Sequence, residues 1–182
     1  MSRKYKFHDQ DLPYFVSFAT VQWIDLFIRP TYADILIDSL RYCQTNKGLQ
    51  IYAWCIMTNH VHLIIGTNKN PMQDILRDFK SFTSNQLRKA IEENSQESRK
   101  KWILWMMKRV GLENGNNNNW QLWQQNNHPL ELNSNKKIEN SLDYIHMNPV
   151  KAGFVSEPYH WKYSSAIDYS GGNGLIDIEL IQ

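Results

Sequence analysis

The stretch that decides the fold is residues 49–65, with the sequence LQIYAWCIMTNHVHLII. Two apolar, β-prone runs, residues 49–57 and 60–65, are separated by the pair Thr58-Asn59. A two-residue connection between such runs is typical of a β-hairpin. We therefore expect an antiparallel hairpin whose second strand begins at His60.

The second strand carries two histidines, His60 and His62, that are one residue apart. Side chains at positions i and i+2 of a strand leave the same face, so these imidazoles point together, and Val61 is free to anchor the opposite face in a core. Two parallel imidazoles form half of a metal site. A structural reading stays open, in which one histidine belongs to the turn and the other is a hydrogen-bonded core residue.

Length and composition predict one folded domain. The chain has 182 residues, of which 42% are hydrophobic, and this is enough to bury a core without disulfides. We expect a single domain over residues 1–182, with a core at about residues 13–150 and a wrapping tail over residues 151–182. The net charge of only +2 gives no global case for nucleic-acid binding, so any such case depends on local clusters.

The sequence also indicates where the protein works. Cys43 and Cys55 have neither C-x-x-C spacing nor a secretory signal ahead of them, so we expect both to be reduced and buried. No apolar run approaches the roughly 20 residues of a membrane span. We therefore expect a soluble, cytoplasmic protein without membrane contact.

The remaining elements complete an α+β pattern. Residues 14–21 suit a first strand, residues 31–46 suit a helix capped by Thr31 and stopped at Gly48, and a second helix opens at Pro71. Residues 101–108 are expected to be helical, and residues 120–124 alternate as a closing strand should. The order is that of a ferredoxin-like βαββαβ sandwich, an antiparallel sheet with helices on one face.

A further helix near the C-terminal end carries Tyr144 and Asn148 before it is ended by Pro149. Four positions separate the two residues, so they share one helical face. A phenol and an amide together suit a metal-assisted nucleophilic site if that face packs against His60 and His62. Structural alternatives are that Tyr144 is a core aromatic and that Asn148 caps the helix.

At this point the chain resembles the single-tyrosine HUH (IS200-like) transposases, and within them the REP-associated tyrosine transposases. The resemblance covers about residues 15–169, and the motifs keep their order. They are IMTNHVHLII (56–65), DFKSFT (78–83), LWQ (122–124), YIHMNPVKAGFV (144–155) and YHWKYSSA (159–166).

The resemblance implies a reaction and a set of residues. His60 and His62 match the histidine pair that binds Mg²⁺ or Mn²⁺, and Asn148 matches the third ligand position. Tyr144 matches the nucleophile that attacks a phosphate of single-stranded DNA and forms a 5′-phosphotyrosine. The implied activity is metal-dependent nicking and joining of hairpin or palindromic DNA, a transposase or endonuclease activity in DNA recombination. Relatives act as dimers or as monomers, so both states stay open.

DNA contacts are expected on local basic and aromatic surfaces. The resemblance favours the short N-terminal arm as a reader of the DNA sequence. The candidates are Arg3, Lys4, Tyr5, Lys6, Arg77, Lys80, Lys89, Trp120, Trp123 and His128.

Two other functions are compatible with parts of the pattern. One is a non-catalytic protein that binds single-stranded nucleic acid on the same fold, which would make the joint occurrence of Tyr144, Asn148 and both histidines a coincidence. The other is a zinc hydrolase with Cys55 or His128 as an added ligand, but Cys55 lies on the other arm of the hairpin and is expected to face inward.

Overall fold

A sheet of four antiparallel strands forms the centre of the computed structural model, which describes residues 7–114, 120–125 and 127–181. The strand order is β2-β3-β1-β4. The strands are β1 (Tyr14–Ala19), β2 (Leu49–Ile56), β3 (His60–Thr67) and β4 (Leu130–Glu131). This order confirms the predicted ferredoxin-like sheet, because the βαββαβ connectivity leaves β1 and β3 in the middle.

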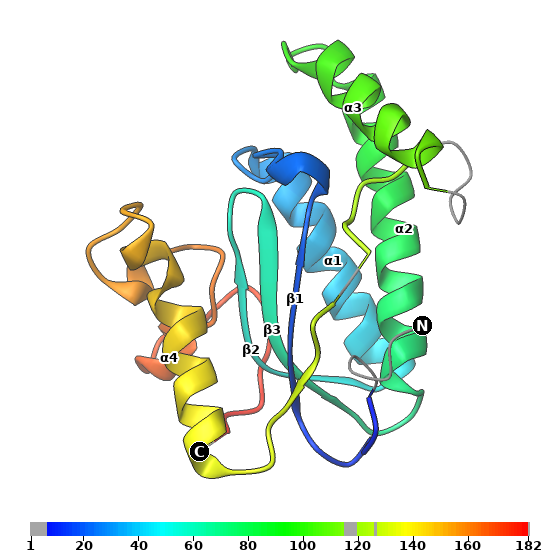
Figure 1. Cartoon of the computed structure of the whole chain (residues 1–182). Helices are drawn as coiled ribbons and strands as arrows, with labels where there is room; N and C mark the ends of the chain where they lie inside the picture. Colours follow the sequence, from blue (N-terminus) through cyan, green and yellow to red (C-terminus); the bar gives the residue numbers. More distant parts are fainter. Residues whose placement is uncertain (1–6, 115–119, 126, 182) are drawn as a thin grey trace.

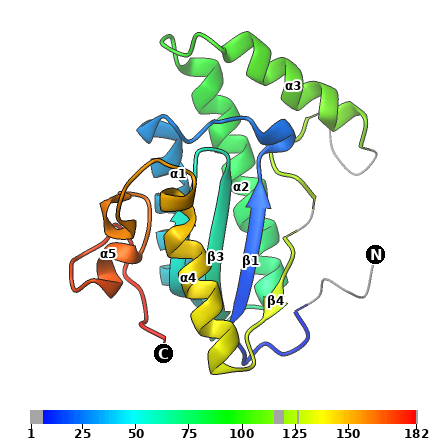
Figure 2. The same cartoon turned by 60° about the vertical axis from the view of Figure 1, so that its left-hand side comes forward.

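Helices cover both faces of this sheet (Figures 1 and 2). On one face lie α1 (Pro30–Lys47) and α2 (Met72–Glu93), and on the other lies α4 (Asn135–Lys151). In the ranges that the structure describes, no helix combines the length and the apolar character needed to cross a bilayer.

The side chains of β3 alternate between the two faces. Val61, Leu63 and Ile65 lie in the large core with α1 and α2, whereas Ile64 belongs to a smaller cluster with Ile145 of α4. Because successive side chains of a strand point to opposite faces, His60 and His62 share the α4 side with Ile64.

The ends of α1 differ slightly from the prediction. The helix begins at Pro30 and not with a cap at Thr31, because the fixed φ of proline suits the first helical position. Its stop is as expected: Gly48 has a φ of 74°, in the left-handed region that favours glycine. The second predicted helix and the helix around residues 101–108 are also present, as α2 and α3 (Lys100–Leu112).

The predicted closing strand at residues 120–124 is wrong. This segment does run beside β1, where Gln124 N donates to Ala19 O at 2.8 Å, but Trp123 makes only an isolated bridge with Thr20. The regular edge strand is β4, farther along the chain. Leu122 and Trp123 are neighbours and both are buried, so the segment does not alternate as a regular strand must.

The C-terminal segment covers the outer edge of β2. Ile56 N donates to Tyr163 O, Ser165 N donates to Trp54 O, and Glu179 N donates to Ile51 O, each at 2.9 Å. The short helices η3 (Pro158–His160) and α5 (Ala166–Tyr169) lie in this segment. These bonds pair backbone groups that an open sheet edge would leave exposed to other chains.

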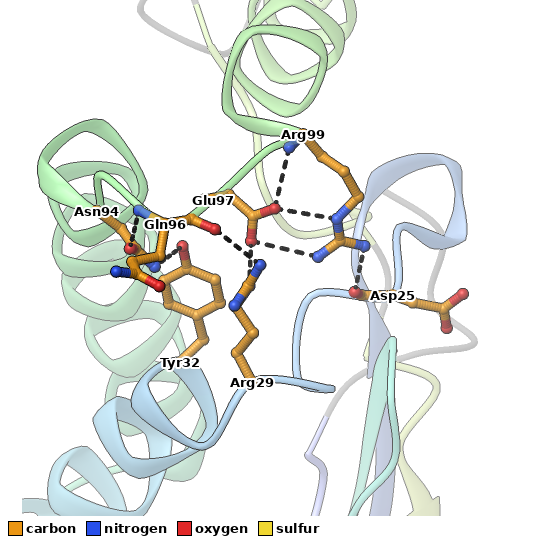
Figure 3. A network of polar contacts seen from close by, with 7 residues as sticks. All are labelled: Asp25, Arg29, Tyr32, Asn94, Gln96, Glu97 and Arg99. Carbon is orange, nitrogen blue, oxygen red and sulfur yellow. Dashed lines mark hydrogen bonds and ion pairs between the residues drawn. The ribbon is translucent and has the colours of Figure 1, made fainter.

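Helix α3 projects beyond the sheet and is held at its base by Glu97 (Figures 1 and 3). The Glu97 carboxylate is fully buried and accepts hydrogen bonds from Arg29 Nε at 2.7 Å and from Arg99 Nε at 3.1 Å. Arg99 also donates to the backbone oxygen of Asp25 at 3.0 Å. Glu97 therefore ties the α2–α3 junction to the loop that follows β1.

The charge on Glu97 contributes to stability. Burial alone would raise the pKa of this carboxyl, but hydrogen bonds from Arg99 and Arg29 outweigh burial and lower the pKa to about 2. A carboxyl with a depressed folded-state pKa stabilises the fold above its ordinary pKa of 4.5, and this contribution is lost as the pH falls toward 2.

We expect Glu97→Gln to lower the free energy of unfolding at pH 7 by about 2 kcal/mol, a value reduced from that of fully buried pairs because both arginines reach solvent. Urea unfolding followed by circular dichroism at pH 7 and at pH 3 measures this. The difference between wild type and variant should shrink at the lower pH. Glu93→Gln, which removes an exposed partner of Lys89, is the matched control and should change little. An undiminished difference at pH 3 would contradict the assignment.

Candidate active site

The i, i+2 pair of β3 meets the i, i+4 pair of α4 on one face of the sheet. The ring centroids of His60 and His62 are 4.7 Å apart, and the Tyr144 ring lies 5.1 Å from that of His62. Asn148 Nδ2 lies 3.2 Å from His62 Nε2. The two pairs that the sequence suggested independently thus form a single cluster.

The turn before β3 sets the protonation of His60. His60 Nδ1 lies 2.7 Å from Asn59 Oδ1, an atom that can only accept a hydrogen bond. The Asn59 amide is oriented by its nitrogen, which donates to Asp25 Oδ1 at 2.9 Å and to Trp23 O at 3.3 Å. His60 therefore carries its proton on Nδ1, which leaves the Nε2 lone pair free for a ligand.

His62 has a hydrogen-bond partner at one of its two ring nitrogens, where Nε2 faces Asn148. The residue is buried and its ring stacks on Phe15 at 5.6 Å, with an angle of 25° between the planes. Within the part of the chain that the structure describes, its Nδ1 is buried without a hydrogen-bond partner. Burying an unpaired nitrogen costs about 1–3 kcal/mol, a cost that folding alone does not explain. His62 is therefore not a core histidine with both ring nitrogens hydrogen-bonded.

Both imidazoles are kept neutral. Burial lowers the pKa of His60, although a hydrogen bond with Asn148 opposes this effect. Burial and the neighbouring His60 lower the pKa of His62 to about 3. A neutral imidazole is the form that binds a metal ion, and the Asn148 amide adds an oxygen donor. The donor set of two imidazoles and one amide therefore fits a divalent cation.

Tyr144 combines a fixed position with access to solvent. Its side chain is 46% exposed, and its ring meets the edge of Phe15 at a centroid distance of 5.8 Å. Phe15 thus contacts both Tyr144 and His62 and holds them side by side. The exposed phenol can be reached by a large substrate such as a DNA strand.

The end of α4 differs from the prediction. Pro149 was expected to end the helix, but α4 continues through it to Lys151. Asn148 therefore lies in the last turn, in register with Tyr144. His146, on the same helix, is half-buried, and its Nε2 lies 3.0 Å from Ser165 Oγ in the C-terminal segment.

The structure separates most predicted DNA contacts from this cluster. Arg77, Lys80 and Lys89 lie on α2, which packs on the opposite face of the sheet from α4. Arg77 and Lys89 are exposed and pair with acidic neighbours on the same helix. Lys80 Nζ donates to Gln124 O and Asn127 Oδ1, both at 2.8 Å, and burial lowers the pKa of Lys80 to about 8. Lys80 therefore serves to fasten the edge segment to α2.

The predicted aromatic contacts have different environments. Trp123 is 4% exposed, stacks on Phe27 and donates from Nε1 to Thr83 Oγ1 at 3.0 Å, so the expectation that it stacks on a base is wrong in this structure. Trp120 is half-buried beneath Arg88. His128 is exposed just before β4. Arg3, Lys4, Tyr5 and Lys6 lie outside the described residues.

A zinc site with cysteine has no support. In residues 7–114, 120–125 and 127–181, no three His, Cys, Asp or Glu side chains come together as metal ligands. Cys43 and Cys55 are free and buried, as predicted. Burial raises the pKa of the Cys55 thiol to about 12, and Cys55 Sγ contacts Met57 Sδ at 3.7 Å.

Comparison with known protein families places the protein among the transposases. A family model described as "Transposase IS200 like" matches residues 25–117, just over half of the chain, and the chain belongs to this family. The matched range contains His60 and His62 and ends before Tyr144 and Asn148.

Individual relatives agree with this assignment. The chain is similar to a curated protein of Haemophilus influenzae named "Putative REP-associated tyrosine transposase", with 30% identity over 115 residues, which is 62% of this chain and 56% of that protein. The chain thus aligns with just over half the length of this relative. A solved REP-associated tyrosine transposase bound to a REP hairpin has the same fold, with a TM-score of 0.66 at 15% identity over 100% of this chain and 94% of that chain. The resemblance drawn from the motifs is confirmed.

Several residues of the site were missed from the sequence. The sequence pattern marks Asn59 only as a turn residue and assigns no site role to Asp25, Trp23 or Phe15. The available signal was the position of Asn59 directly before the histidine pair, which places its side chain within reach of His60. Asp25 and Trp23 come from a distant loop, which only the folded chain brings to the turn.

We expect Asn59→Ala to leave the tautomer of His60 unfixed, because the oxygen that faces its Nδ1 is removed. Long-range ¹H–¹⁵N NMR of the histidine side chains reports which nitrogen carries the proton. Wild type should show His60 protonated at Nδ1, and the variant should show a mixture of tautomers. Asn68→Ala, which removes an exposed asparagine elsewhere, should leave the spectrum unchanged. A His60 signal that is identical in Asn59→Ala would refute the role of this turn.

Proposed function

We propose that this protein cuts and rejoins single-stranded DNA by forming a covalent bond between Tyr144 and a 5′-phosphate. The observation that carries this proposal is the convergence of Tyr144 and Asn148 with His62, at a ring distance of 5.1 Å and an atom distance of 3.2 Å. Membership of the IS200-like transposase family supports the same reaction class.

The chemistry follows from the residues of the cluster. The Tyr144 oxygen attacks the phosphorus, and its proton passes to solvent. The bond from phosphorus to the 3′ oxygen of the preceding nucleotide breaks, and this oxygen takes up a proton from solvent. The products are a 5′-phosphotyrosine and a free 3′-hydroxyl. Rejoining is the reverse reaction, in which a 3′-hydroxyl attacks the phosphotyrosine and Tyr144 leaves.

His60, His62 and Asn148 would hold Mg²⁺ or Mn²⁺ next to the phosphate. A bound divalent cation stabilises the negative charge that develops on the phosphate oxygens. The nitrogen-rich donor set suits Mn²⁺ better than Mg²⁺. Each imidazole also contacts a residue that would not bind the metal. Asn59 contacts His60 and Phe15 stacks on His62, and these contacts fix the orientation of both rings.

The proposed partner is DNA with an unpaired segment beside a hairpin or palindrome. The relative of the same fold is bound to a REP hairpin, and the exposed Tyr144 is accessible to such a strand. Within a single chain, α4 brings Tyr144 and Asn148 close to His62, which supports a first strand cut by a monomer, and a dimer is compatible with it.

We expect Tyr144→Phe to abolish the covalent product without loss of folding, because only an exposed hydroxyl is removed. Wild-type protein is incubated with labelled hairpin DNA and Mn²⁺, and the products are separated by denaturing electrophoresis. A protein-linked DNA band should form and should disappear in the variant or with a chelator. Tyr159→Phe, a similarly exposed tyrosine at 45%, should retain the band. A band that persists in Tyr144→Phe would exclude Tyr144 as the nucleophile.

We expect His60→Ala to weaken Mn²⁺ binding by more than about tenfold, since it removes an imidazole ligand. Titration of Mn²⁺ followed by electron paramagnetic resonance measures binding without DNA and without turnover. His160→Ala removes an exposed histidine outside the cluster and is the matched control. Equal Mn²⁺ affinity of His60→Ala and wild type would contradict the proposed ligand set.

A further inference from the structure

We propose that Trp23 and the groove beside it bind one unpaired nucleobase of the DNA strand, next to the phosphate at Tyr144. The choice of ligand rests on the proposed function. Trp23 belongs to the short helix η2 (Val21–Trp23), which follows β1. Four observations support a binding role: exposure, backbone strain, position and the chemistry of the groove.

The indole of Trp23 lies mostly in solvent instead of packing in the core. Its side chain is 57% exposed, more than the two exposed tryptophans of α3. An indole buries a large apolar surface when it packs, so an indole that a rigid loop holds in solvent has no stabilising role there. Stacking on a nucleobase is a use that such a surface can have.

The backbone is strained at this position. Gln22 and Trp23 have φ angles of 53° and 52°, so two consecutive residues with bulky side chains occupy the left-handed region that favours glycine. Such conformations persist only where the surroundings enforce them, and they cluster at functional sites. This strain directs the indole out of the fold.

The loop is fixed to the same turn that orients His60. Trp23 O accepts a hydrogen bond from Asn59 Nδ2 at 3.3 Å, and Trp23 N donates to Thr20 O at 3.2 Å. Two residues after Trp23, the backbone oxygen of Asp25 accepts a hydrogen bond from Arg99. Arg99 in turn donates a hydrogen bond to the buried carboxylate of Glu97 (Figure 3). Trp23 is therefore held rigidly relative to the cluster of His60, His62 and Tyr144.

The indole lies directly beside that cluster. The ring centroids of Trp23 and His60 are 5.8 Å apart, with an angle of 75° between the planes. Because the two rings meet edge to face, His60 does not stack along the indole plane. A base that stacked on Trp23 would therefore belong to a nucleotide close to the attacked phosphate.

The groove next to Trp23 has the chemistry of a base site. It has a volume of about 350 Å³ and is lined by apolar Val110 and by glutamines at positions 22, 121, 124 and 125. Gln124 Nε2 donates to Thr20 O at 3.0 Å, so this amide is held in one orientation. Amides carry both donors and acceptors, as the edges of bases do. None of the described residues that line the groove is charged, so none of them attracts a phosphate.

The test is a base-deletion scan in the Tyr144→Phe background, where no strand is trapped covalently. The probe is a labelled hairpin oligonucleotide with short unpaired arms, in which each arm nucleotide in turn is replaced by an abasic one. Binding is measured by fluorescence anisotropy. Trp23→Asn removes the indole but tolerates a positive φ, and Trp23→Phe retains an aromatic ring. Trp102→Ala, which removes an indole with 48% exposure on α3, is the matched control.

We expect one arm position at which loss of the base weakens binding about 5- to 150-fold. Trp23→Asn should weaken binding of the intact probe to a similar extent and lose sensitivity at that position. Trp23→Phe should keep part of the sensitivity to base removal at that position, and Trp102→Ala should keep all of it. Equal binding of all probes by Trp23→Asn and its parent, with an unchanged melting temperature, would overturn the inference.

The covalent assay with Tyr144 intact separates this inference from the proposed function. If covalent product forms normally in Trp23→Asn and the scan is unchanged, the base site is refuted and the proposed function stands. If wild type forms no covalent product but the scan depends on Trp23, the proposed reaction is refuted and the base site stands.

Discussion

The central constraint in this structure is the double pairing of β3. The strand is hydrogen-bonded to β1 on one side and to β2 on the other, so that His62 lies opposite both Ser17 and Cys55. A slip of one residue would turn His60 and His62 into the core under α1 and α2 and would expose Val61. Because two neighbours and a buried face fix the register, the histidines are held on the side where α4 packs.

The turn between β2 and β3 connects this strand to its surroundings. The Asn59 side chain contacts His60, Asp25 and the backbone of Trp23, while Thr58 donates to Asp25 Oδ1 at 2.6 Å. The loop that holds Asp25 is in turn bound through Arg99 to Glu97. A single hydrogen-bonded network thus extends from a buried carboxylate at the base of α3 to the ring of His60. Preorganisation of this kind holds an imidazole ready for a ligand, so little rearrangement is needed on binding.

Local patterns in the sequence predicted the parts of the fold that are governed by local physics. The hairpin around Thr58-Asn59, the stop of α1 at Gly48 and the helix after Pro71 depend on neighbouring residues, and all are present. The edge beside β1 was placed too early, because Leu122 and Trp123 are both drawn into the core by contacts with distant elements. The alternation of apolar and polar residues over positions 120–124 could not reveal that both side chains are buried. The sequence predicts a helix end at Pro149, yet α4 continues to Lys151 and Pro149 itself is buried.

In the candidate site, too, local sequence patterns predicted some features and tertiary packing decided the others. The spacing of His60 and His62 on a strand, and of Tyr144 and Asn148 on a helix, established which side chains share a face, since those periods are properties of the backbone. That the two faces meet is a result of packing between segments more than 80 residues apart, as the hydrogen bond between Asn148 and His62 records. The roles of Asn59, Asp25, Phe15 and Trp23 also arise from tertiary contacts. A tautomer, a ring orientation and a strained loop depend on partners that are distant in sequence, and these partners adjoin only in the folded chain.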